Sequence, residues 1–171
     1  PVVTLPLDPT HYAESWVKMH LAIAMLPGGY GGSAELTKPD SEYRAILARY
    51  MPVLQRMSRA GWRPITEAVS SSESVGVERF GPGSGGEVFF SVRNRGTEEA
   101  RAQVRFDLTA AGVPDAPRCR LVDAVSGEAM ASAGADGVAT LEVRLQPGDV
   151  MAVGVMGGLA EGETDVSEAI Q

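Results

Sequence analysis

The chain has 171 residues, 44% hydrophobic and 22% charged, which suits one domain with a real core or a small domain with an appendage. Its net charge is −7 and its arginines are scattered, so it lacks the basic surface that nucleic-acid binding requires. No apolar stretch approaches the ~20 residues of a membrane span. The single cysteine, Cys119, excludes an internal disulfide and a cysteine-rich zinc site. We therefore expect neither nucleic acid nor a membrane as a partner, while the composition leaves the compartment open.

A first helix is predicted from about His11 to Leu26, after the N-cap residue Thr10. Apolar side chains occur almost all round it, which is typical of a helix buried between other elements. A glycine-rich stretch then breaks the helix: PGGYGGS.

The second helix has the clearest periodicity in the chain. Asp40 is its expected cap, Pro52 is expected to kink it, and Gly61 is expected to end it, with Trp62 making a hydrophobic capping contact. Six apolar side chains fall within about 100° of arc at helical spacing. They are Tyr43, Ile46, Leu47, Tyr50, Leu54 and Met57.

From about Ile65 onward the hydrophobic period changes to two, as in half-solvated antiparallel strands. Two segments alternate cleanly, RAQVRFDL and VATLEVRL, and Pro147 and Gly148 fit the centre of a type II turn. Six or seven short strands with this spacing favour a β-sandwich. The predicted fold class is therefore α+β: a helical segment with two main helices over 1–64, an antiparallel β-sandwich over 65–158, and a flexible acidic tail over 159–171.

One short motif suggests nucleotide binding. Gly81, Gly83 and Gly86 match the pattern G-x-G-x-x-G, which cradles a pyrophosphate when it connects a strand to the N-terminus of a helix. Here a second strand, EVFFSVRN, follows the loop, and Pro82 removes one backbone donor from it. We interpret the loop as a hairpin connection and expect no cofactor.

Residues suited to catalysis do not converge in the sequence. The two histidines, His11 and His20, point about 180° apart on the first helix, so they cannot share a metal ion, and no metal site is predicted. Carboxylate pairs suit glycoside hydrolysis, but 22 acidic residues produce such pairs by chance, and we interpret them as solvated surface charge. The pairs considered are Glu73 with Glu78 and Asp8 with Glu14.

The aromatic residues are unevenly distributed. Both tryptophans and all four tyrosines lie at or before Trp62, and the later strands contain only phenylalanines. The predicted sandwich therefore lacks the flat, polar-edged platforms on which sugars stack. Tyr30, between two pairs of glycines, cannot be packed by its immediate neighbours, so it is a candidate for ligand contact.

The order of these segments resembles the C-terminal stretch of bacterial TIM-barrel glycoside hydrolases, in which the last barrel helices lead into a β-sandwich. The resemblance covers nearly the whole chain and is carried by YRAILARYMPVLQRMSRAGWRPITEAV, then VGVERFG, and finally LQPGDVMAVGV. It implies that Asp8 to Tyr12 rim the substrate crevice, because barrel sites are built from the loops after strands. His11 and Tyr12 therefore join Tyr30 as candidate substrate-binding residues. The ~250 residues of barrel that carry the catalytic carboxylates have no counterpart here, so no catalytic residue is assigned.

We therefore expect a non-catalytic C-terminal region of a carbohydrate-active enzyme, whose partner is the catalytic barrel of the same or a partner chain and whose candidate ligand is carbohydrate. The chain begins at Pro1 without a methionine, which favours a fragment of a longer protein. The alternative is an independent β-sandwich module for protein interaction or adhesion. A small self-contained enzyme has the least support, for want of a convergent acid–base arrangement.

Overall fold

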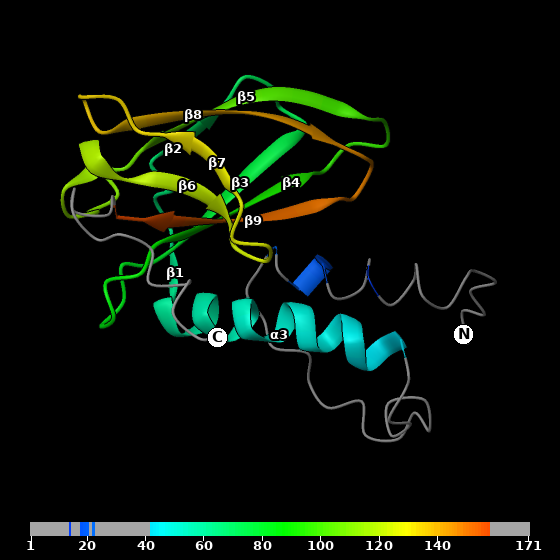
Figure 1. Cartoon of the computed structure of the whole chain (residues 1–171). Coiled ribbons are helices and arrows are strands. Elements are labelled where there is room, and N and C mark those ends of the chain that lie inside the picture. Colours follow the sequence, from blue (N-terminus) through cyan, green and yellow to red (C-terminus); the bar gives the residue numbers. More distant parts are fainter. Residues whose placement is uncertain (1–13, 15–17, 21, 23–41, 158–171) are drawn as a thin grey trace, which may run out of the picture.

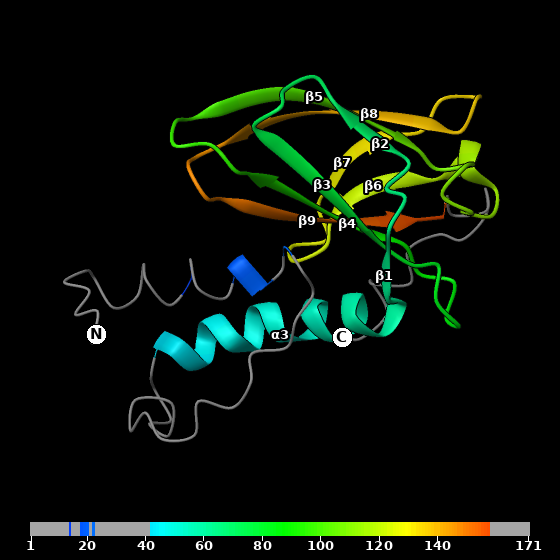
Figure 2. The ribbon, with the colours of Figure 1, turned by 180° about the vertical axis from the view of Figure 1, so that it is seen from behind.

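The computed structural model describes residues 14, 18–20, 22 and 42–157. Its elements form three layers: a three-stranded sheet, a six-stranded sheet and one long helix (Figures 1 and 2). The larger sheet lies between the smaller sheet and the helix, so both of its faces are covered over much of their area. None of the helices in the described part of the chain has the length and apolarity to cross a membrane.

The helix α3 spans Glu42–Ala60. Its buried side chains follow the predicted stripe, because positions three and four apart share one face of a helix. Gly61 follows it and donates its N–H to the carbonyl oxygen of Met57 at 3.1 Å, as expected for a helix C-cap. Pro52 lies within the helix, and the kink that we expect there stays a prediction.

Nine antiparallel strands follow in the described residues, two more than the upper expectation of seven. The larger sheet has the order β1-β3-β4-β9-β6-β7 and the smaller one β2-β5-β8. The larger sheet contains β1 (Trp62–Arg63), β3 (Val75–Phe80), β4 (Phe89–Asn94), β6 (Arg120–Asp123), β7 (Ala129–Ser132) and β9 (Val150–Met156). The smaller sheet contains β2 (Ala68–Ser70), β5 (Ala100–Asp107) and β8 (Val138–Leu145), and a 3₁₀ turn, η1 (Ala116–Arg118), precedes β6.

The alternation of β5 and β8 is confirmed, because every second side chain in each strand is buried. The strand β9 lies between β4 and β6 and is largely buried, as its apolar sequence predicts for a central strand. The turn before it closes with a hydrogen bond from the N–H of Asp149 to the carbonyl oxygen of Gln146 at 3.0 Å.

Two apolar clusters hold the three layers together. The inter-sheet core lies between the sheets, where the rings of Phe90 and Phe106 meet at 4.8 Å between centroids. The helix–sheet core lies between α3 and the larger sheet, and it includes Tyr50, Val53, Leu54, Met57, Ala60, Phe80, Phe89, Val150 and Ala152. A helix that supplies half of a core to a sheet stabilises that sheet through buried apolar area.

The described residues of the first predicted helix also contact this assembly. Glu14 and residues 18–20 are helical, in agreement with that prediction. The Tyr50 hydroxyl donates to Glu14 Oε1 at 2.6 Å, and Lys18 Nζ lies 3.1 Å from Asp149 Oδ1. These contacts join the N-terminal segment both to α3 and to the turn before β9.

Candidate functional site

The three substrate-binding candidates from the sequence, Tyr30, His11 and Tyr12, lie outside the described residues, as does the Asp8 to Tyr12 rim. They stay predictions. Within the described part of the chain, no group of three or more metal-ligating side chains comes together.

The glycine loop is a hairpin connection, as predicted. It joins β3 to β4, which pair antiparallel from Phe80 opposite Phe89. Gly83 lies against the C-terminal end of α3, where an added Cβ atom would come within 3.0 Å of the Ala60 carbonyl oxygen. A helix C-terminus carries partial negative charge and free carbonyls, so it repels the anion that a helix N-terminus attracts.

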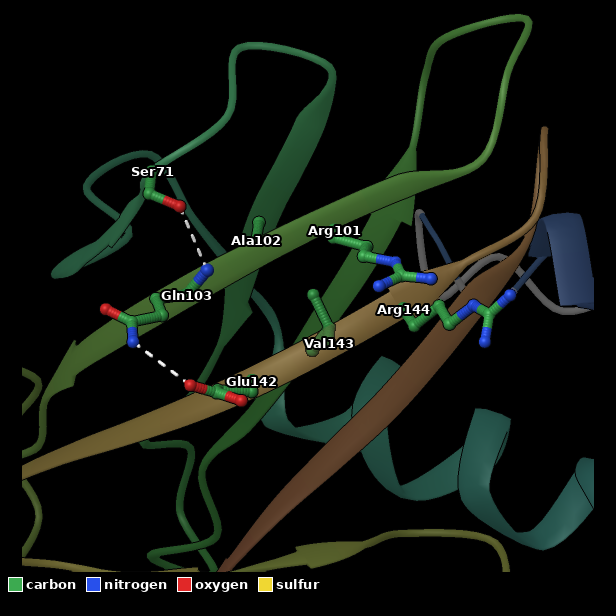
Figure 3. A pocket seen from close by; sticks show the side chains of 7 residues that line it. All are labelled: Ser71, Arg101, Ala102, Gln103, Glu142, Val143 and Arg144. Carbon is green, nitrogen blue, oxygen red and sulfur yellow. Dashed lines mark hydrogen bonds between the residues drawn. The ribbon is translucent and has the colours of Figure 1, made fainter.

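One shallow depression of about 580 Å³ opens on the outer face of the smaller sheet. Figure 3 shows Arg101 and Arg144 side by side at one end of it, with Gln103 and Glu142 at the other. Gln103 Nε2 donates to Glu142 Oε1 at 3.1 Å, and the backbone N–H of Gln103 donates to the Ser71 hydroxyl at 2.9 Å. These side chains reach the surface because they occupy the outward positions of β5 and β8.

A neighbouring carboxylate, that of Glu99, bridges the two arginines. Arg144 Nε lies 2.8 Å and Arg101 Nε 3.3 Å from Glu99, and Gln146 Nε2 donates to the same group at 2.8 Å. The hydrogen bond from Arg144, followed by that from Gln146, holds the pKa of Glu99 below its usual value. The depression is lined by one carboxylate among the described residues, Glu142, and by no aromatic side chain. It has neither the carboxylate pair of a glycosidase nor a stacking platform.

A second surface, around Trp62 at the edge of the larger sheet, was not predicted from the sequence. Trp62 does not cap α3 through a buried contact: it lies in the edge strand β1 and is 56% exposed. Its indole Nε1–H donates to Glu78 Oε2 at 2.9 Å, and Arg95 donates to Glu78 Oε1 at 3.1 Å. The larger sheet therefore carries an exposed tryptophan at its edge, contributed by a residue that the sequence analysis assigned to the helical segment.

The sequence holds only part of the information that defines this surface. Phe80 and Glu78 are two residues apart in the same strand, so they share one face, and Trp62 is the register partner of Phe80. The pairing itself could not be foreseen, because a two-residue strand has no measurable period. Glu78 therefore anchors neighbouring side chains, and the interpretation that it is only solvated surface charge is incomplete.

No protein-family model matches the sequence, and the search of curated proteins finds no match. Among solved structures, the chain is similar to a GH27 β-L-arabinopyranosidase from Geobacillus stearothermophilus, at 15% identity and a TM-score of 0.56; the match covers 95% of this chain and 33% of the enzyme. It is also similar to α-galactosidase I from Mortierella vinacea, at 13% identity and a TM-score of 0.51, covering 92% of this chain and 38% of that one. The chain thus spans about a third of each enzyme's length. The predicted resemblance to glycoside hydrolases is confirmed at the level of the fold.

Proposed function

We propose that the chain is the non-catalytic C-terminal region of a glycoside hydrolase, where it braces the catalytic barrel. The fold match carries this proposal: nearly the whole chain corresponds to about a third of an enzyme in each of two glycosidases.

In this proposal, residues 1–64 are the end of the barrel, 65–158 the sandwich and 159–171 an acidic tail. The helix–sheet core supplies the mechanical link, since Leu54 and Met57 of α3 pack on Phe80 and Phe89 of the larger sheet. His11, Tyr12 and Tyr30 then belong to the rim of the barrel and contact carbohydrate there. The catalytic carboxylates lie on the remaining barrel, by analogy with the barrel architecture.

The proposal is tested by removing the sandwich from the protein encoded by the complete gene. A version that ends after residue 64 is expected to aggregate or to lose at least 10 °C in melting temperature, because the apolar face of α3 becomes exposed. Unchanged solubility, stability and glycosidase activity in the truncated protein would contradict a bracing role.

One observation favours the alternative, an independent interaction or adhesion module. The α3 helix already covers one face of the larger sheet, and the outer face of the smaller sheet carries mostly charged and amide side chains beside the exposed Val69, so most of the apolar sheet surface in the described part of the chain is covered without a barrel. Sedimentation and binding of a hydrophobic dye separate the two. A stable monomer that binds no dye favours the module, and a dye-binding or aggregating chain favours the fragment.

A further inference from the structure

The Trp62 side chain is 56% exposed, and a hydrogen bond to its indole fixes its orientation. Its indole N–H is held by Glu78, and the same carboxylate accepts a hydrogen bond from Arg95. The three side chains form a row that we call the Trp62 row. The hydrogen bond lies at the edge of the indole and uses none of its π surface, and more than half of the side chain is exposed to solvent.

The row is built into the sheet and does not arise from flexible surface side chains alone. Gly76, on the same face of β3 as Glu78, leaves the space that the Arg95 guanidinium occupies: an added Cβ atom would lie 2.2 Å from Arg95 Nε. Both polar partners stay accessible, since the Glu78 side chain is 31% exposed and that of Arg95 55%. The row therefore offers a flat apolar ring beside both a hydrogen-bond acceptor and a donor.

We propose that the Trp62 row is a binding site for one unit of a neutral oligosaccharide, a proposal that rests on the proposed role in a carbohydrate-active enzyme. The C–H face of a pyranose would stack on the indole of Trp62, while neighbouring hydroxyls donate to Glu78 and accept from Arg95. The ligand is neutral because the two charges of the row cancel one another. The acidic chain as a whole and the carboxylate in the row disfavour a phosphate-bearing ligand.

Tryptophan fluorescence provides the test. A Trp16→Phe background leaves Trp62 as the one emitting indole, and it is titrated with malto-, cello-, xylo- and galactosyl-manno-oligosaccharides of four to six units. We expect a saturable change in emission with at least one of them. Titration calorimetry then compares substitutions: Trp62→Ala should weaken binding at least ten-fold, and Gly76→Ala about three-fold or more, because it displaces Arg95.

The matched control is Ile65→Ala, which truncates another side chain of the same segment that is 64% exposed and should leave the affinity unchanged. Circular dichroism melts of every variant show whether the fold is retained. Absence of saturable binding to all four sugars, or binding that survives Trp62→Ala, would overturn the inference. So would a dimer that Trp62→Ala dissociates without any sugar response, since the row would then contact a second copy of the chain.

The outcomes also separate this site from the proposed function. Glycosidase activity in the protein encoded by the complete gene, without sugar binding at Trp62, would remove the site and leave the proposed function standing. Sugar binding at Trp62 in a protein whose complete gene product hydrolyses no glycoside would support the site and contradict that function.

Discussion

Replacing Leu54 by alanine removes a fully buried side chain from the contact between α3 and the larger sheet. Its neighbours in the helix–sheet core include Met57, Phe80 and Phe89, all buried, so the site can collapse only partly into the space left behind. Substitutions of this kind cost about 2–5 kcal/mol, through lost transfer energy and the residual cavity. At about 3 kcal/mol, a chain of this size should lose roughly 6–12 °C in melting temperature.

The informative comparison is with Leu121→Ala, which removes an equally buried leucine from the inter-sheet core. If helix and sandwich unfold as one cooperative unit, both variants lower the midpoint of a single urea transition followed by far-ultraviolet circular dichroism. The reasoning would be refuted if Leu54→Ala left the main transition in place and created a separate early one. In that case α3 would not be part of the structure that stabilises the sheets.

Three further changes test particular contacts. Asn94→Ala should lower the free energy of unfolding, measured by urea denaturation, by about 2–4 kcal/mol, because the buried amide bridges two backbone carbonyls and one backbone N–H. A decrease below about 0.5 kcal/mol would contradict this and show that water replaces the amide. Gly81→Ala should destabilise the fold by several kcal/mol, because φ is +92° and an added Cβ atom would lie 2.1 Å from a backbone oxygen across the loop. Its control, Gly86→Ala, has φ of +72° but open space around the Cβ position, and it should cost about 1 kcal/mol. Equal melting temperatures of the two variants would contradict this difference. Burial, and to a lesser extent the hydrogen bond to Glu14, holds the pKa of the Tyr50 phenol well above its usual value. The unfolded chain therefore loses this proton at a lower pH than the folded one, and the free energy of unfolding should fall as pH rises past about 10. Tyr50→Phe should lack that alkaline loss, and an identical decline in both proteins would assign it to other groups.

The fold could be predicted from the sequence wherever one element carries its own periodic signal. Arg101, Gln103 and Arg105 alternate with buried partners in β5, and the pattern states which face is wet without knowledge of any other strand. The stripe of α3 is equally self-contained. Local chemistry was also sufficient for the turn at Gly148 and for the hairpin loop at Gly81.

Features that depend on contacts between distant segments could not be read from the sequence. Phe80 and Phe89 belong to the helix–sheet core, because the second face of the larger sheet is covered by α3. Ser91 is buried on the same face of the larger sheet, where its hydroxyl donates to the carbonyl oxygen of Ala22 in the N-terminal segment at 2.9 Å. The Trp62 row could not be predicted because it also depends on contacts between distant segments. The strand β1 is only two residues long and is a strand only through its pairing with β3.

Glycoside hydrolysis provides the most direct test of the central claim that this chain is a non-catalytic brace. The 171-residue chain and the protein translated from its complete gene are assayed side by side with a panel of aryl glycosides that includes α-galactosides and β-L-arabinopyranosides. The account predicts no turnover by the chain alone and measurable turnover by the complete protein. Hydrolysis by the isolated chain, or its absence from the complete protein across the panel, would contradict it.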